Sequence, residues 1–116
     1  MVAVKSQHAP AFLKSPPQAI SAVLFFGSDP GLVSERSQQL AKLYAERENP
    51  PGEVLRLDDT DLEEDTGRLA VELQTRPMFS GRKILRAIAG RRIGAQLLKP
   101  ILYEDTLEGL LIVEAG

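Results

Sequence analysis

Residues 22–30, with the sequence AVLFFGSDP, decide the predicted fold. The first five are a continuous apolar run, which is typical of a strand buried on both faces of a sheet. Gly27 and Ser28 then form a turn. Asp29 suits the N-cap of a helix, and Pro30 suits its first position because a helix leaves that N–H without a partner. The stretch therefore predicts a buried strand, a short turn and a helix.

The alternation of strand and helix continues along the chain. Apolar residues recur on one face of the helix to about Arg47, and the residues 49–52, NPPG, end it. The remaining predicted elements are a strand over 53–57, a helix marked by Leu62, Leu69 and Leu73 and limited by Pro77, a strand over 83–88, a helix over 93–102 and a strand over 109–114. This order predicts an α/β fold, a mostly parallel sheet flanked by helices on both faces.

The length of 116 residues indicates one domain with one hydrophobic core. We assign it to residues 21–116. Residues 1–20 carry Pro10, Pro16 and Pro17 and are interpreted as an N-terminal arm with one helical turn around residues 11–14. Because the sequence stops directly after a predicted buried strand, we expect it to be an N-terminal fragment of a longer chain.

Composition excludes several classes of protein. No run approaches the roughly 18 apolar residues that span a bilayer, and the first residues lack the apolar core of a signal peptide. The absence of cysteine excludes disulfides, thiol catalysis and cysteine-bound metals. We therefore expect a cytoplasmic protein without a membrane partner. A net charge of −2 provides no overall attraction to nucleic acid.

The turn after the first strand stands where a nucleotide-binding domain keeps its phosphate loop, Gly-x-x-x-x-Gly-Lys-Ser/Thr. Aligned on Gly27, that motif places Leu32 at the second glycine and Val33 at the lysine, and only Ser34 matches. Asp29 would repel a phosphate and take the helix amides itself. The sequence therefore predicts a degenerate phosphate loop, and no cofactor is expected.

No catalytic or metal site is predicted elsewhere. His8, the only histidine, lies in the arm, and no nucleophile–base pair can be assembled. The six acids of the run 58–65 lack the glycine and glutamate spacing of a calcium loop, and capping of the following helix by Thr60 or Asp61 explains most of the run. Among the strand ends that would hold magnesium, Glu114 stands alone.

Six bases lie between residues 82 and 99, with no acid from 81 to 103: Arg82, Lys83, Arg86, Arg91, Arg92 and Lys99. Two interpretations are open. The stretch is either a surface that faces phosphates or a solvated helix face and loop.

Residues 77–81, PMFSG, place two large apolar side chains where a helix must stop. Turns normally carry polar residues, because an exposed apolar pair gains nothing from water. Met78 and Phe79 are therefore either part of the core or a wedge offered to a partner.

The chain resembles the delta subunit of the bacterial DNA polymerase III clamp loader. The resemblance begins with residues 24–36, LFFGSDPGLVSER, in which a strand, a Gly-x-Asp turn and a helix replace a working phosphate loop. It continues through Leu57-Asp58, Leu73-Gln74, Met78-Phe79, Gly81-Arg82-Lys83-Ile84 and residues 111–116, LIVEAG. It covers about residues 20–116, and no single motif is specific by itself.

The resemblance implies a RecA-like, AAA+ type domain that acts in DNA replication. In that family the domain binds and opens the ring-shaped sliding clamp, the beta subunit, while neighbouring subunits hydrolyse ATP. The expected partners are this clamp and the gamma/tau and delta prime subunits, with DNA contacted indirectly or weakly. No catalytic activity is expected of the domain itself, although the family belongs to a polymerase holoenzyme with nucleotidyltransferase activity.

The family's clamp contact is a hydrophobic pair, commonly Leu-Phe, at the end of the second main helix. Met78 stands for the leucine and Phe79 for the phenylalanine. Pro77 departs from the pattern and either stiffens the wedge or shifts its angle. Gln74 and Thr75 would support or border the contact. Two alternatives are a divergent nucleotide-binding domain with ATPase or kinase activity and a DNA-binding module that uses the basic stretch 82–99.

Overall fold

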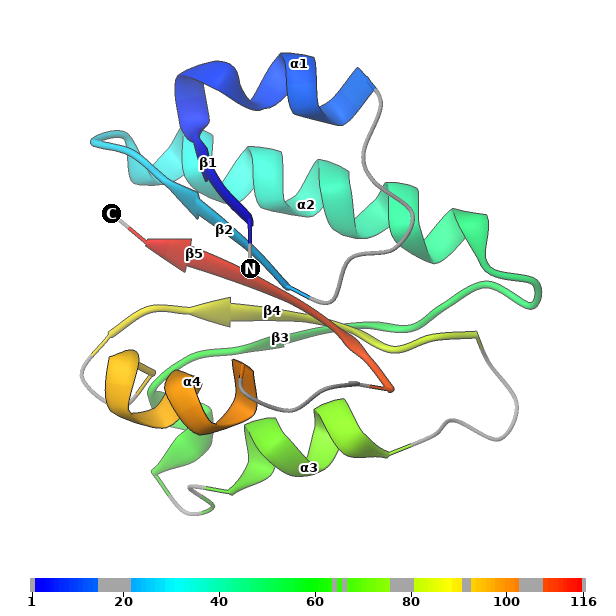
Figure 1. Ribbon diagram of the computed structural model, residues 1–116, viewed down its shortest axis with the longest axis vertical. Coiled ribbons are helices and arrows are strands. Elements are labelled where there is room, and N and C mark those ends of the chain that lie inside the picture. The colour runs from blue at the N-terminus through cyan, green and yellow to red at the C-terminus, as the bar shows by residue number, and fades with distance from the viewer. Residues whose placement is uncertain are drawn as a thin grey trace.

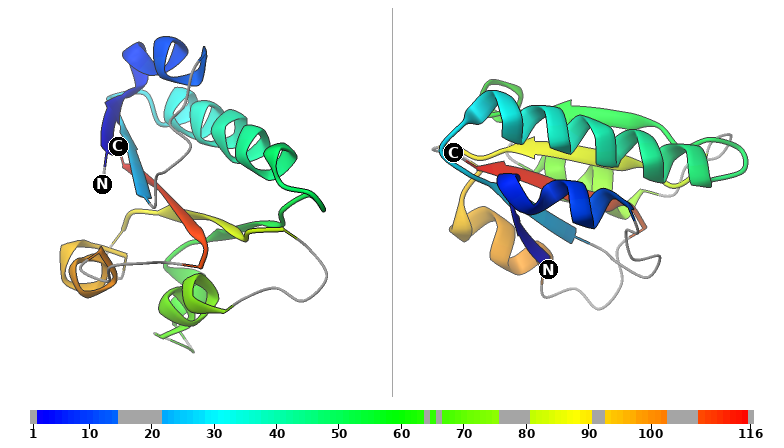
Figure 2. Two further views of the ribbon diagram at one scale, coloured as in Figure 1. Left: turned by 45° about the vertical axis from the view of Figure 1, so that its right-hand side comes forward. Right: turned by 90° about the horizontal axis from the view of Figure 1, so that it is seen from above.

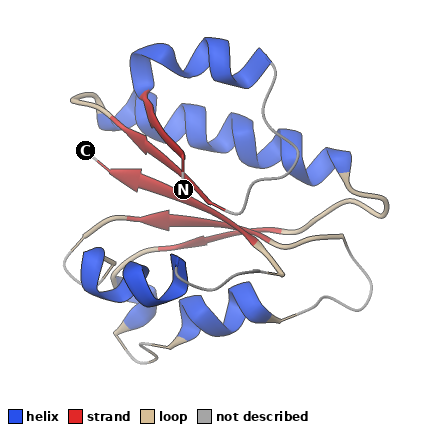
Figure 3. Cartoon of the chain, in the orientation of Figure 1, coloured by secondary structure: helices blue, strands red, loops and turns tan. Residues whose placement is uncertain are grey.

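The fold is that of a computed structural model, which describes most of the chain. The described residues are 2–14, 22–63, 65, 67–75, 81–90, 93–102 and 108–115. Figure 1 shows a central sheet with helices on both sides, and Figure 3 shows its strands as one layer. The predicted α/β class and the predicted helices on both faces are confirmed.

All neighbouring strands of the sheet are parallel, in the order β1-β2-β5-β4-β3. The strands are β1 (Val2–Lys5), β2 (Ala22–Phe26), β3 (Val54–Leu57), β4 (Ile84–Ile88) and β5 (Leu110–Ala115). Four of them occupy the predicted stretches to within a residue. The central strands β2, β5 and β4 are the most apolar, as expected for strands covered on both faces.

The helix α2 (Pro30–Arg47) follows β2 and begins where it is predicted. Asp29 is its N-cap: the Oδ1 atom accepts hydrogen bonds from the amides of Gly31 at 3.1 Å and Leu32 at 3.2 Å. Glu48 is its C-cap, in extended conformation. The helix therefore starts and stops through local chemistry that the sequence carries.

The connection from β3 to β4 differs from its prediction as one helix. It consists of a 3-10 turn, η2 (Thr60–Leu62), and a separate α3 (Arg68–Gln74). Capping of the helix by Thr60 or Asp61 is also wrong, because both residues lie within η2 and the N-cap of α3 is Gly67. Asp58 Oδ1 accepts from the amides of Thr60 and Asp61 at 3.0 and 3.3 Å. Such side-chain bonds to the following amides compete with helix formation.

The N-terminal arm expected over residues 1–20 contains elements of the fold. β1 adds to the edge of β2, and η1 (Ser6–His8) and α1 (Ala9–Lys14) follow it. The predicted helical turn around 11–14 lies within α1. Phe12 packs edge-to-face on Phe25 with ring centroids 6.1 Å apart, which attaches α1 to the core. For the described residues 2–14 the interpretation as an arm outside the domain is corrected.

Two apolar clusters lie on the two faces of the sheet. Figure 2 shows α1 and α2 over one face, and α3 and α4 (Ala95–Leu102) over the other. Phe25, Leu40 and Ile112 belong to the first cluster, and Leu73 and Leu111 to the second, all fully buried. Of the helices that the structure describes, none is long and apolar enough to cross a membrane.

Candidate functional site

The predicted clamp contact lies where α3 ends and β4 begins. Pro77, Met78 and Phe79 fall outside the described residues, so their orientation stays a prediction. Gln74, the last residue of α3, and Thr75, its C-cap, are exposed. The structure thus places both predicted bordering residues at the surface, next to the segment that carries the apolar pair.

The helix end before this 76–80 segment is fixed by short bonds. The Thr75 amide donates to the Val71 carbonyl at 3.0 Å, and the Thr75 hydroxyl donates to the same oxygen at 2.6 Å. Gly109, just before β5, donates its amide to the Leu73 carbonyl at 2.9 Å. The end of α3 is therefore attached to the residue that precedes β5, at the end of the sheet where the strands begin.

Gly81 and Arg82, which follow the 76–80 segment, are held at the same end of the sheet. The Gly81 amide donates to the Pro51 carbonyl at 3.1 Å, and the Arg82 amide donates to Glu48 Oε1 at 3.0 Å. The Arg82 guanidinium also donates to the Gly109 carbonyl at 3.2 Å. Both ends of the 76–80 segment are thus held near the start of β4 and β5.

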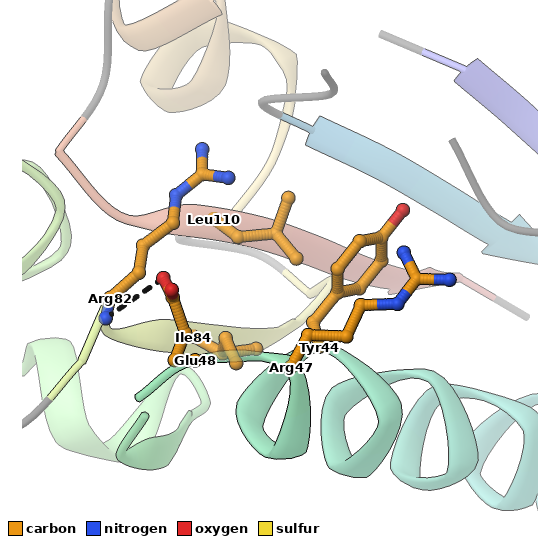
Figure 4. A pocket seen from close by; sticks show the side chains of 6 residues that line it. All are labelled: Tyr44, Arg47, Glu48, Arg82, Ile84 and Leu110. Atoms are coloured by element: carbon orange, nitrogen blue, oxygen red, sulfur yellow. Dashed lines mark hydrogen bonds between the residues drawn. The ribbon is translucent and has the colours of Figure 1, made fainter. Parts of the chain in front are cut away.

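A pocket of about 380 Å³ lies directly beside Arg82. Its described lining residues are Tyr44, Arg47, Glu48, Arg82, Ile84 and Leu110. Figure 4 shows Arg82 on one side of the pocket, Tyr44 and Arg47 on the other side, and the two apolar residues between them. Ile84 and Leu110 are fully buried and form an apolar floor. We call this site the Arg47–Arg82 pocket.

The pKa of Tyr44 depends on the burial and the charges of the Arg47–Arg82 pocket. Burial raises the pKa of the Tyr44 hydroxyl, while the charges of Arg47 and Arg82 oppose that rise. The Arg47 Cζ atom lies 5.3 Å from the centroid of the Tyr44 ring, within range of a cation–π contact. Two guanidinium groups therefore act on one buried phenol from opposite sides of the pocket.

The turn after β2 has the contacts of a capped helix. The Asp29 carboxylate occupies amides of the first turn of α2, which a bound phosphate would need. Ser6 packs against Gly27 so closely that a Cβ atom added to Gly27 would lie 3.1 Å from the Ser6 Cβ atom. The prediction that Asp29 takes the helix amides is confirmed.

Arg86 and Glu114 form a buried ion pair that the sequence analysis missed. The Arg86 Nε and Nη2 atoms lie 3.0 and 2.8 Å from Glu114 Oε2, and both residues are more than nine-tenths buried. Ser37 donates its hydroxyl to the same carboxylate oxygen at 2.9 Å, and Arg86 Nη2 donates to Ser34 Oγ at 3.3 Å. The carboxylate of Glu114, considered in the sequence only as a magnesium ligand, is thus engaged by a base and a hydroxyl. The sequence does show an acid and a base within otherwise apolar strands, but it does not show that these two strands are neighbours.

The described bases of the stretch 82–99 do not gather on one surface. Arg86 is buried in its ion pair, and Lys83 pairs with Glu72 of α3. Arg82 lines the pocket at the start of β4, and Lys99 is exposed on α4. Arg91 and Arg92 fall outside the described residues. Neither a phosphate-facing surface nor a solvated helix face and loop accounts for all of the other four bases.

No protein-family model, curated protein or solved structure matches the chain.

Proposed function

We propose that this chain is the clamp-binding N-terminal domain of a clamp-loader delta subunit. In this proposal Met78 and Phe79 enter an apolar pocket of the sliding clamp and help to open the ring during DNA replication. The fold is then RecA-like, of the AAA+ type, and its other partners are the gamma/tau and delta prime subunits in the cytoplasm. The all-parallel sheet flanked by helices is consistent with such a fold.

The observation that carries the proposal is the anchoring of both ends of the 76–80 segment at one edge of the sheet. Met78 is three residues from Thr75, and Phe79 is two residues from Gly81. Because an extended residue spans at most about 3.6 Å, Met78 and Phe79 stay within roughly 11 and 7 Å of these anchors. Both anchors lie where β4 and β5 begin, so a wedge formed by Met78 and Phe79 would be offered from that end of the sheet.

The energetics of such a wedge are sufficient for specific binding. Burial of a Met or Phe side chain stabilises a complex by roughly 1.5–3 kcal/mol each. Methionine is close to leucine in volume and adapts to an irregular pocket, and phenylalanine is a typical anchor of an interface. Anchored flanks also reduce the conformational entropy that the segment loses on binding.

ATP hydrolysis is not part of the proposed function. The Asp29 carboxylate accepts hydrogen bonds from the Gly31 and Leu32 amides, and it would repel a phosphate at that helix end. These contacts favour a binding domain over the alternative of a divergent ATPase or kinase. Measurable nucleotide affinity of the chain would support that alternative instead.

Titration of the chain with its cognate sliding clamp tests the proposal. We expect the wild type to bind and the double variant Met78→Ala with Phe79→Ala to lose at least about a hundredfold in affinity, because both side chains would be buried in the complex. Unchanged clamp affinity in this double variant would contradict the assignment of Met78 and Phe79 as the clamp contact.

A matched control removes apolar side chains elsewhere. Phe26 at the end of β2 and Leu43 on α2 are each 36% exposed, so Phe26→Ala with Leu43→Ala deletes a similar apolar area away from the 76–80 segment. We expect the control to keep its clamp affinity. Thermal melting of both double variants separates the two interpretations of the pair: a large fall in Tm for Met78→Ala with Phe79→Ala would identify it as core.

A further inference from the structure

We propose that the Arg47–Arg82 pocket binds an acidic side chain of the sliding clamp, next to the apolar pocket that receives Met78 and Phe79. This inference rests on the proposed function and deepens it, because it adds a charged contact to an apolar one. The occupant is a carboxylate on a short apolar stem, as aspartate and glutamate provide.

The shape of the pocket suits this occupant. Its volume of about 380 Å³ is near the lower end for ligand sites and accommodates a side chain rather than a large ligand. The floor of Ile84 and Leu110 packs against an apolar stem, while the two guanidinium groups stand at the sides (Figure 4). Arginine is the residue best suited to a carboxylate because its N–H groups match both oxygens.

The charges of the pocket also favour an anion. Its described ionisable lining comprises two guanidinium groups, one carboxylate and the Tyr44 phenol. The carboxylate, Glu48, already accepts the Arg82 amide. The Arg82 guanidinium is held at the wall by its bond to the Gly109 carbonyl, which uses one of its five N–H donors. An entering carboxylate would therefore meet an Arg82 guanidinium that is already held in place beside the buried apolar floor.

The location connects the pocket with the proposed interface. Arg82 follows Phe79 by three residues, so at most roughly 11 Å of chain separates the two. A clamp surface that buries Phe79 lies within reach of the Arg82 side chain. Charge pairs at the border of an apolar contact set orientation and the rate of association, which an apolar pair alone does not fix.

A DNA phosphate is the less suitable occupant. Phosphate binding draws on several bases along one surface, and the described bases of the 82–99 stretch point to different parts of the fold. The buried apolar floor also has no counterpart in a phosphate group. We therefore assign the pocket to a carboxylate of the clamp.

Charge substitution with a matched control tests the assignment. Arg47→Gln with Arg82→Gln removes both guanidinium groups and keeps the Arg82 amide bond to Glu48. The control, Lys42→Gln with Arg56→Gln, removes the same charge from side chains that are 78% and 52% exposed. At about 50 mM salt we expect at least a tenfold loss of clamp affinity for the first variant and less than about threefold for the control, with the difference shrinking at about 0.5 M salt.

Carbodiimide coupling identifies the carboxylate directly. The variants Arg47→Lys and Arg82→Lys each place an amine in the pocket, and this reagent joins an amine to a carboxylate that contacts it. We expect a clamp peptide with an aspartate or glutamate to be coupled to position 47 or 82 in the variants. The wild type, whose native lysines are all still present, should lack this product.

The outcomes separate this inference from the proposed function. If the wild-type chain does not bind the clamp, both are overturned. If Met78→Ala with Phe79→Ala weakens binding but the pocket variant matches its charge control, only the pocket assignment is overturned. It is also overturned if the pocket variant keeps clamp affinity and instead loses salt-sensitive binding to primed DNA.

Discussion

Arg86 and Glu114 show at the scale of single residues how a charged pair organises this sheet. The two side chains extend from β4 and β5 toward α2, where Ser37 completes the hydrogen bonds of the carboxylate. An unpaired charge at such depth is strongly unfavourable, so each residue depends on the other. The pair was not predictable, because the sequence does not give the strand order that makes β4 and β5 neighbours.

Removal of one partner of this pair tests its contribution to stability. Glu114→Gln keeps the shape but leaves the Arg86 charge buried without a counter-charge, and we expect a loss of about 3–5 kcal/mol in the free energy of unfolding. The double variant Arg86→Met with Glu114→Leu should lose much less, because no charge stays buried. Urea unfolding measures both. A single-variant loss below about 1 kcal/mol would show that the pair contributes little.

Tyr44 provides a pH-dependent observable in the pocket. Burial raises its pKa above the ordinary value, so this residue stabilises the fold fully below about pH 10, and the contribution is lost as pH rises through the folded-state pKa. Arg47→Gln removes an opposing charge, and we expect it to raise the pKa of Tyr44 further. Phenolate absorbance against pH measures the change, and Tyr44→Phe identifies the signal of the other tyrosine, Tyr103. A lowered Tyr44 pKa in Arg47→Gln would contradict the description of the pocket.

At the scale of elements, local signals predicted helix ends well where one residue controls them. Asp29 and Pro30 start α2 as expected, because capping depends only on nearby amides. The prediction of one helix after β3 was wrong, because Asp58 accepts hydrogen bonds from the amides of Thr60 and Asp61 and the chain forms a short turn there. The spacing of leucines predicts which residues face the core, but it does not show whether an aspartate side chain will bind the following amides and form a turn.

The Asp29 cap has a measurable contribution. Asp29→Ala leaves the Gly31 and Leu32 amides without their side-chain acceptor, and we expect a loss of about 1 kcal/mol in the free energy of unfolding. Asp29→Ser, which keeps an acceptor, should recover most of that stability. Chemical denaturation compares the three proteins, and equal stability of the alanine and serine variants would argue against capping.

At the scale of the whole molecule, the alternation of apolar strands and amphipathic helices was sufficient to predict a parallel α/β sheet. The edge strand β1 was missed because its four residues, VAVK, are too few to show a period and precede a proline-rich stretch. Of the predicted clamp contact, the structure places Gln74 and Thr75 at the surface. Met78 and Phe79 themselves remain a prediction from resemblance.

The packing of the N-terminal elements against the turn after β2 joins distant parts of the fold. Gly27→Ala would bring a methyl group against Ser6, which is buried, and we expect a loss of about 1–3 kcal/mol from overpacking. Ser6→Gly in the same chain removes the clashing side chain and should recover part of that loss. A double-mutant cycle by thermal unfolding measures the coupling, and strictly additive losses would show that the two residues do not interact.

The 18 residues of α2 give it a mechanical property as well. At 1.5 Å per residue the helix is a rod of roughly 27 Å, with the Asp29 cap at one end and Arg47 at the other. Near its first third, Ser34 and Ser37 are bonded to the buried Arg86–Glu114 pair, which forms a fixed support under the rod. Leu40, Ala41, Tyr44 and Ala45 bury the following turns of the helix against the same face of the sheet. The helix is therefore fixed along most of its length, and it holds Arg47 in the pocket at the opposite end from the Asp29 cap.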